Sequence, residues 1–323
     1  MKLLVTGGAG YIGSVVTARL LEGGHQVVVL DDLSTGHADA VPPGARLVVA
    51  GIADDGAVRE MLSDGVEAVL HFAARSLVGE SETAPERYFG NNVGGTLALL
   101  ESMRATGVRG LVFSSTCAVY GDPIVPGPLD ETNPYRPQSA YGASKIAADL
   151  MISAYTRAHG FGAVSLRYFN AAGAYGAYGE RHATETHLIP LALRTLTEPE
   201  RVLKILGTDY PTPDGTAVRD YIHVLDLADA HVLALEALAA GRHEIYNLGS
   251  GIGTSVREIV DVIGELAGIP VNTVEAERRQ GDPPLLVAAI DKITRELAWK
   301  PQRSRHQIIG DALEFAQRAT PSA

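Results

Sequence analysis

A tyrosine and a lysine stand one helical turn apart in the segment YGASK, at Tyr141 and Lys145. Side chains at this spacing lie on the same face of a helix. Because a nearby cation favours the ionised form of a phenol, we expect the pKa of Tyr141 to lie below its usual value of about 10. Such a tyrosine would act as an acid and a base near neutral pH. The pentapeptide alone is equally compatible with an ordinary surface helix, because short motifs match by chance.

A glycine-rich segment, VTGGAGYIG, follows the first apolar run and contains Gly7, Gly10 and Gly13. Glycines let the backbone approach a pyrophosphate, and the start of the next helix supplies N–H donors and a positive dipole end. Asp31 ends the second apolar run, where a carboxylate accepts hydrogen bonds from ribose hydroxyls and repels a 2′-phosphate. The pattern predicts a dinucleotide site that prefers NAD to NADP. The alternative is a tight turn beside a surface aspartate.

Apolar runs and helical patterns alternate through the first half of the chain, which predicts a parallel sheet covered by helices on both faces. After residue 170 glycine, tyrosine and proline become common, and we expect a smaller α/β lobe. The predicted fold is a Rossmann-type doubly wound α/β domain over 1–170, with a second lobe over 171–323 and segments near 220–250 returning to the first. The predicted strands are 2–6, 26–30, 46–50, 68–72, 110–115, 163–169 and 244–249, and the predicted helices are 11–22, 55–63, 85–106, 140–158 and 226–240.

Composition narrows the classes of function. The chain has 323 residues, 46% hydrophobic and 20% charged, with a formal charge of 27 − 38 = −11. A net acidic chain without a dense basic cluster argues against nucleic-acid binding. The one cysteine, Cys117, excludes an intrachain disulfide, and without an adjacent histidine we expect it to be inert. No apolar run is long enough to span a bilayer, so we predict a cytoplasmic protein without membrane partners.

A hydroxyl, a tyrosine and a lysine after a glycine-rich turn resemble the short-chain dehydrogenase/reductase superfamily. In that resemblance Tyr141 is the catalytic acid and base, Lys145 binds the nicotinamide ribose and Thr116, in FSSTCAVYG, is the third member. The match extends over nearly the whole chain to the UDP-sugar epimerases of the extended branch. Its most specific segments are TGGAGYIG (6–13), PYRPQSAYGASK (134–145) and VRDYIHVLDLADAH (218–231).

The resemblance implies a binding site for NAD built from the glycine turn, the loop after the second strand and the ends of later strands. The residues that it implies are Gly7, Gly10, Tyr11, Ile12, Gly13, Asp31, Asp32, Ser34, Thr35, Gly36, Ile52, Phe72, Ala73, Ala74, Asn91, Ser114, Tyr141, Lys145 and Tyr168. Two departures put the affinity for NAD in doubt. Gly51 stands where these epimerases usually have an aspartate that contacts adenine, and Ser76 stands where a lysine is common.

The resemblance also implies a site for a UDP-sugar, mainly in the second lobe. Arginine suits diphosphate recognition because its planar fork matches phosphate oxygens. The implied roles are a diphosphate clamp by two arginines, a hold on the uridine ribose by Asp282 and contacts near the uracil or sugar by the others. The implied substrate residues are Thr116, Tyr141, Asn170, His187, Leu188, Lys204, Ile205, Arg219, Arg279 and Asp282.

The implied reaction is reversible 4-epimerisation of UDP-glucose and UDP-galactose through a transient 4-keto sugar with bound NAD. Related dehydratases carry an Asp-Glu pair after the strand-end threonine, but Cys117 and Ala118 stand there and cannot eliminate water. Leu286 occupies the position that limits room around the sugar C2, so other UDP-sugars (N-acetylhexosamines, pentoses, uronic acids) stay open. Two alternatives remain. One is an NAD-dependent sugar-nucleotide reductase or dehydrogenase that causes a net redox change, and the other is a non-catalytic NAD-binding sensor.

Two further expectations concern metals and assembly. His182, Glu185 and His187 offer ligand types, but their spacing does not match a zinc helix such as H-E-x-x-H, so we predict no metal site. The helices predicted near 85–106 and 140–158 build dimers in related proteins. The resemblance therefore implies a homodimer.

Overall fold

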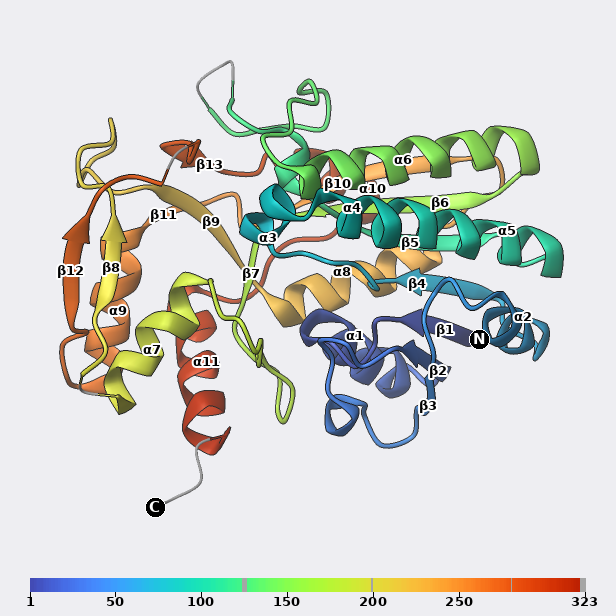
Figure 1. Ribbon diagram of the computed structural model, residues 1–323, viewed down its shortest axis with the longest axis horizontal. Coiled ribbons are helices and arrows are strands. Elements are labelled where there is room, and N and C mark those ends of the chain that lie inside the picture. Colours follow the sequence, from blue (N-terminus) through green and yellow to red (C-terminus); the bar gives the residue numbers. More distant parts are fainter. Residues whose placement is uncertain (124–126, 199, 280, 320–323) are drawn as a thin grey trace.

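The computed structural model describes residues 1–323 except 124–126, 199, 280 and 320–323, so the end of the predicted second lobe lies outside the described residues. Two lobes lie side by side (Figure 1). The larger contains a seven-stranded sheet in the order β10-β6-β5-β4-β1-β2-β3 with every pair parallel. The Rossmann-type prediction is therefore confirmed. The strands are β1 (Lys2–Thr6), β2 (Gln26–Asp31), β3 (Arg46–Val49), β4 (Ala68–His71), β5 (Gly110–Thr116), β6 (Gly162–Tyr168) and β10 (His243–Leu248).

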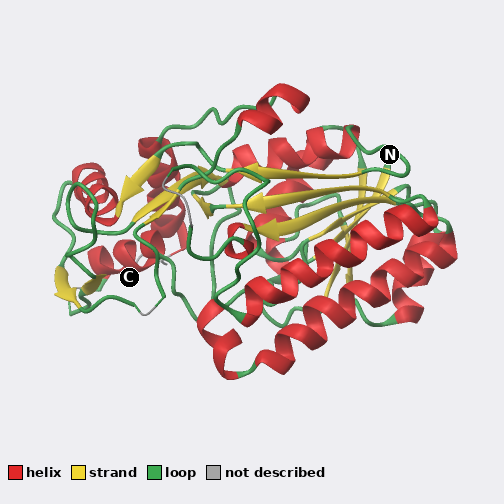
Figure 2. Cartoon of the chain, turned by 90° about the horizontal axis from the view of Figure 1, so that it is seen from above, coloured by secondary structure: helices red, strands yellow, loops and turns green. Residues whose placement is uncertain are grey.

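The alternation of side chains along the strands assigns helices to the two faces of this sheet. Leu3 and Val5 belong to one buried cluster, whereas Leu4 between them belongs to another. Successive strand residues point to opposite faces, so each cluster is a sheet face with its helices. The first face is covered by α1 (Tyr11–Glu22) and α8 (Val224–Glu236), and the second by α2 (Asp55–Ser63), α5 (Thr96–Thr106) and α6 (Ala140–His159). Figure 2 shows these helices flanking the long strands.

The helix predicted over 85–106 is confirmed, but it is not α-helical throughout. The structure has α3 (Val78–Thr83), α4 (Pro85–Tyr88), a π-helix over Phe89–Gly95 and then α5. Glycine weakens an α-helix, and three glycines fall in the π-helical segment FGNNVGG. One of them is required by packing, because a Cβ on Gly95 would lie 2.5 Å from Ile52 Cδ1. The wide turn therefore follows from close contact between this segment and the loop after β3.

The smaller lobe has two small sheets and a separate core. Strands β11 (Gly253–Ser255), β9 (Val218–His223) and β13 (Leu285–Leu286) pair in that order, with β7 (Asn170–Ala172) on β9, while β12 (Thr273–Ala276) pairs with β8 (Leu203–Leu206). Its core joins α7 (Leu188–Thr197), α9 (Val256–Ala267) and α11 (Arg305–Ala319). A capping box between Ser255 and Glu258 begins α9. Within the described part of the chain, every helix is too short or too polar to cross a membrane.

The chain passes between the lobes more than once. After β6 it builds β7, α7, β8 and β9, and α8 then packs back against α1. β10 follows and pairs with β6 at the edge of the large sheet, in register from His243 opposite Ala163 to Leu248 opposite Tyr168. The last part of the second lobe then follows, except that α10 (Asp291–Leu297) packs beside β10. The chain therefore enters the small lobe from the carboxyl ends of β6 and β10.

Candidate active site

The glycine turn is compact, and its glycines leave no side chain between its backbone and a ligand. Gly7 has φ +75°, and a Cβ there would lie 2.6 Å from Ala73 N. A Cβ on Gly13 would lie 2.2 Å from Gly7 O. α1 begins after Gly10, which has no side chain to cap the first amides of the helix. Uncapped N–H groups at a helix start beside glycines form an anion cradle, so the local structure fits the diphosphate of NAD.

Asp31 organises the loop that follows β2. Its side chain is buried, and its carboxylate accepts hydrogen bonds from Ala9 N at 3.0 Å and Leu33 N at 2.9 Å. Burial raises the pKa of Asp31, and these two hydrogen bonds oppose the rise. Asp32 is exposed and accepts a hydrogen bond from Ser34 N at 2.9 Å. The carboxylate thus ties the loop to the glycine turn, and its contact with a ribose stays a prediction.

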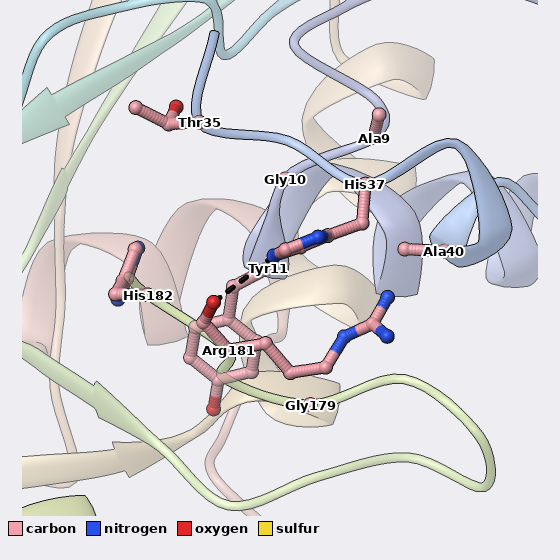
Figure 3. A pocket seen from close by; sticks show the side chains of 9 residues that line it. All are labelled: Ala9, Gly10, Tyr11, Thr35, His37, Ala40, Gly179, Arg181 and His182. Atoms are coloured by element: carbon pink, nitrogen blue, oxygen red, sulfur yellow. Dashed lines mark hydrogen bonds between the residues drawn. The ribbon is translucent and has the colours of Figure 1, made fainter. Parts of the chain in front are cut away.

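A pocket joins this turn to the second lobe (Figure 3). The predicted cofactor residues Gly10, Tyr11 and Thr35 line it from the first lobe, and Gly179, Arg181 and His182 line it from the second. His37 Nε2 lies 3.0 Å from Arg181 O across the two sides. The sequence analysis did not single out His37 or Arg181, because neither belongs to a motif. The lining residues are Ala9, Gly10, Tyr11, Thr35, His37, Ala40, Gly179, Arg181 and His182.

The predicted catalytic residues meet where β5 ends and α6 begins. Ser139 caps α6 by accepting a hydrogen bond from Gly142 N at 3.1 Å, which places Tyr141 in the first turn. Thr116, the last residue of β5, makes a side-chain hydrogen bond with Tyr141. The expected low pKa of Tyr141 is wrong for this structure: burial raises it to about 12, and the Thr116 hydrogen bond only partly opposes that effect.

Lys145 is buried one turn further along α6. Its ammonium donates a hydrogen bond to Ser114 O at 2.9 Å and lies 4.8 Å from the centroid of the Phe113 ring. Burial lowers the pKa of Lys145 to about 8, although the charge of Asp149 opposes the shift. The helical spacing therefore predicts the shared site, but desolvation, which the spacing does not reveal, sets both pKa values.

Two further polar residues support this group. Asn92, in the π-helix, accepts a hydrogen bond from Arg75 N at 2.8 Å and donates to Ser144 Oγ at 3.0 Å, which joins the loop after β4 to α6. Asp149 accepts a hydrogen bond from Ser115 Oγ at 3.1 Å. The sequence analysis missed both. Asp149 stands one further helical turn from Lys145, so the same spacing rule was available to find it.

The remaining predicted cofactor residues border these loops and strand ends. Ile12, Gly36, Ala74, Asn91 and Ser114 are half-buried, and Ser34 and Thr35 are exposed. The Phe72 ring centroid lies 4.9 Å from that of His231, whose Nε2 makes a hydrogen bond with the Tyr168 hydroxyl. Ala73 N lies 3.5 Å from Thr6 Oγ1, and Ile52 is buried against Gly95. His231 therefore links two predicted cofactor residues.

In the second lobe, Arg219 and Asp282 come together. Arg219 Nη2 lies 2.5 Å from Asp282 Oδ1, and the arginine side chain is 12% exposed. Arg279 is exposed and shares a turn with Asp282, whose N donates to Arg279 O at 3.2 Å. Burial raises the pKa of Cys117 to about 12, although the charge of Arg219 opposes the rise. A thiol with that pKa stays protonated at neutral pH, and the inertness of Cys117 stays a prediction.

The other predicted substrate residues are more dispersed. Asn170 Nδ2 donates to Asp220 O at 3.2 Å, where β7 pairs with β9. His187 precedes α7 and Leu188 is its first residue. On β8 the side chain of Lys204 is exposed, whereas Ile205 is 3% exposed and faces the lobe interior. Ile205 therefore offers a ligand little side-chain surface.

The parallel sheet, the glycine turn and the Thr116–Tyr141–Lys145 group define a nucleotide-binding enzyme of the short-chain dehydrogenase/reductase type. Residues 3–249 match the model of the NAD dependent epimerase/dehydratase family, and the chain belongs to that family.

Named relatives and solved structures resemble the chain over almost its full length. It is 53% identical over 317 residues to a UDP-glucose 4-epimerase of Corynebacterium glutamicum, covering 98% of this chain and 95% of the relative. The crystal structure of UDP-glucose 4-epimerase from Brucella ovis in complex with NAD matches with a TM-score of 0.93 and 44% identity, covering 97% and 98% of the two chains. The Bifidobacterium longum enzyme in complex with NAD⁺ and UDP matches with a TM-score of 0.92 and 30% identity, covering 98% of each chain.

Proposed function

We propose that this chain interconverts UDP-glucose and UDP-galactose by reversible epimerisation at C4, using NAD. The observation that carries the proposal is the meeting of Thr116, Tyr141 and buried Lys145 at the carboxyl edge of a parallel sheet whose first strand leads into a glycine turn. Ligands of such sheets bind at this edge. The relatives at 45–53% identity that carry the name UDP-glucose 4-epimerase support the same reaction.

The side chains have separate roles in the proposed reaction. Tyr141 takes the proton from the sugar 4-hydroxyl and later returns one, and Thr116 orients the same oxygen. NAD held at the glycine turn would supply the group that accepts and returns the hydride. The low pKa of Lys145 and the high pKa of Tyr141 both report a site from which water is excluded. Burial raises the pKa of Tyr141 to about 12, so the proposed reaction requires the tyrosinate to be stabilised when the ligands bind, and Lys145, one helical turn away, is the cation placed to do so.

The second lobe supplies the proposed hold on the nucleotide. Arg219 is mostly buried and already oriented by Asp282, so its remaining N–H groups are positioned for diphosphate oxygens. Asn170 lies at the start of β7, close in sequence to the end of β6. We infer that 1–170 bind mainly NAD and that 171–323 bind mainly the sugar nucleotide.

The choice of sugar rests on one position in the second lobe. Leu286 in β13 pairs with Arg219 in β9 and is half-buried against the hydrophobic cluster of Val119, Tyr120, Leu129, Phe169 and Ala288. Its side chain is of intermediate size, which favours hexoses without an N-acetyl group and leaves N-acetylated sugars as the second candidates. Replacement of Leu286 by Ser is expected to raise activity on UDP-N-acetylgalactosamine relative to UDP-galactose.

Turnover of UDP-galactose without added NAD tests the proposal. UDP-glucose formation, with NAD(H) released from the denatured protein near one per chain, would support an epimerase that retains its cofactor. Turnover only after NAD is added would support the reaction with weak retention, for which Gly51 and Ser76 are the first residues to examine. Conversion that consumes NAD in proportion to product would replace the epimerase with a net dehydrogenase.

The proposed homodimer uses the outer surface of α4, the π-helix, α5 and α6. Three large apolar side chains are exposed there: Phe89 at 43%, Leu97 at 42% and Leu150 at 59%. Exposed apolar groups of this kind favour an interface. Light scattering of the protein and of its Leu150→Glu variant measures the oligomeric state.

The cytoplasmic location stays a prediction from the sequence.

A further inference from the structure

Four metal-ligating side chains meet in the loop between β7 and α7. Glu180, His182, Glu185 and His187 each offer one ligand atom, and these atoms all lie within 4.8 Å of one another. His182 is also at the edge of the pocket that faces the glycine turn (Figure 3). The spacing E-x-H-x-x-E-x-H does not match a zinc-binding helix, because the loop rather than a helical repeat brings the groups together.

The separations between the donor atoms suit a small tetrahedral ion. Zinc binds nitrogen and oxygen ligands at about 2.0–2.2 Å, which places neighbouring tetrahedral ligands about 3.3–3.6 Å apart. His187 Nδ1 lies 2.7 Å from Glu180 Oε1 and 2.8 Å from Glu185 Oε1. His182 Nδ1 lies 3.0 Å from Glu180 Oε1 and 4.0 Å from Glu185 Oε2. Shifts of less than 1 Å, roughly, would bring these pairs to the tetrahedral separation.

The carboxylates are costly to bury without a cation. The side chain of Glu185 is 1% exposed and that of Glu180 is 9% exposed. Buried charges are normally paired or coordinate a metal. Two carboxylates and two neutral imidazoles would balance the charge of one divalent ion. The same charges act on nearby Tyr11. Burial raises the pKa of its hydroxyl, and the charges of Glu180 and Glu185 raise that pKa further.

Backbone contacts already orient one carboxylate. Glu185 Oε1 accepts hydrogen bonds from Thr186 N and His187 N, both at 2.7 Å. Hydrogen bonds of this kind fix metal ligands in position. The rings of His182 and His187 lie side by side, with centroids 5.4 Å apart and planes tilted by 34°, so their Nδ1 atoms face the same carboxylates.

We propose that Glu180, His182, Glu185 and His187 form a structural zinc site. Four protein ligands close the tetrahedron, which is typical of structural rather than catalytic zinc. A bound ion would fix the loop that leads into α7 and would hold it beside Tyr11 at the start of α1. The site is separate from the acid–base group, and its existence does not depend on the proposed epimerase reaction.

The test uses the full chain, freed of metal with a chelator and then titrated with Zn²⁺ by calorimetry and with Co²⁺ by visible absorption. We expect one ion per chain, intense absorption typical of tetrahedral cobalt and a higher midpoint of thermal unfolding with Zn²⁺. His182→Ala and Glu185→Gln should each weaken Zn²⁺ binding at least about ten-fold. His306→Ala is the matched control, because His306 is 49% exposed and pairs with Glu265 outside the cluster.

Two other results would contradict the proposed zinc site. Absence of stoichiometric binding to the parent chain would leave the cluster as histidine–glutamate ion pairs. In that state the two carboxylates outweigh desolvation and raise the pKa of His187 to about 10. Equal Zn²⁺ affinity in the parent, His182→Ala and Glu185→Gln chains would place the ion elsewhere. Glu180→Gln, which keeps the side-chain shape, provides a second ligand variant should either of the others fail to fold by circular dichroism.

Discussion

The two lobes place their functional residues in different ways. In the large lobe these residues sit at the ends of regular elements: Thr116 ends β5, Tyr141 and Lys145 lie in the first turns of α6, and Gly13 lies in the first turn of α1. In the small lobe they occupy short strands and irregular turns, and Arg279 is exposed where Arg219 is mostly buried. The large lobe therefore holds its functional residues on regular elements, whereas those of the small lobe differ widely in secondary structure and in exposure.

This difference has a physical origin in the cores. Strands of the large sheet are buried on both faces, so each strand end is held by two hydrophobic clusters. In the pair of β8 and β12, by contrast, one face is exposed: Leu203 is buried in the cluster with α7, α9 and α11, whereas Lys204 is exposed. Substitutions in the large lobe should accordingly have large effects with little variation, and those in the small lobe should follow the burial of each residue.

The largest expected effect is the loss of the proton-transfer group. Tyr141→Phe keeps the ring and removes the hydroxyl that hydrogen-bonds Thr116. We expect kcat to fall about 10²- to 10⁴-fold, the usual contribution of a positioned acid–base group. Steady-state assay with UDP-galactose measures the loss, and extraction of bound nucleotide should show unchanged NAD content. Wild-type rates in this variant would contradict the proposed mechanism.

Acid should next destabilise the large lobe through His71. His71 is buried between Thr6 and Thr96, and burial lowers its pKa from 6.5 to about 3, with the charge of Lys145 adding to the effect. Between pH 6.5 and about 3, His71 is protonated in the unfolded chain but neutral in the folded chain. The free energy of unfolding therefore falls as the pH falls towards 3. Between pH 6.5 and 4.5 this group should cost roughly 2–3 kcal/mol. Urea unfolding measures the slope, which His71→Asn should reduce.

A glycine pair compares the lobes directly. Gly13→Ala should lower the free energy of unfolding by about 1–3 kcal/mol, because its Cβ would meet Gly7 O at 2.2 Å. Gly310→Ala, in α11 of the small lobe, meets nothing within 4 Å and should raise stability by about 0.5–1 kcal/mol. Thermal and urea unfolding of both variants measure the changes. Equal losses would show that the two backbones are equally constrained.

The smallest effects should separate the two arginines of the small lobe. Arg219→Ala removes a mostly buried guanidinium and leaves Asp282 unpaired, so KM for UDP-galactose should rise about ten- to a hundred-fold. Arg279→Ala removes an exposed side chain and should raise KM by about three-fold or less. A larger effect at Arg279 would mean that its turn closes over the bound nucleotide.

Much of the large lobe was accessible from the sequence. Buried parallel strands and their helices leave strong apolar patterns, and the predicted α1 and α2 have the observed bounds. The helix over 85–106 was predicted, but its π-helical segment was not, because the packing of Gly95 against Ile52 joins residues that are distant in sequence. The pKa of Tyr141 was wrong for a related reason: helical spacing reports neighbours on one helix, whereas burial depends on the whole fold. No metal site was predicted from His182, Glu185 and His187, because their spacing does not match a zinc-binding helix, and Glu180 was not considered with them.

The edge strand β10 has a consequence for synthesis. β6, buried along its whole length, pairs with β10, and Leu248 lies 80 residues beyond Tyr168 in the chain. At about 5–20 residues per second, a ribosome needs about 4–16 s to make that stretch. During this interval the nascent sheet has an open edge able to pair with other chains. Chaperone dependence should therefore be highest while residues 169–248 are being translated, before β10 covers the edge of the fully buried strand β6.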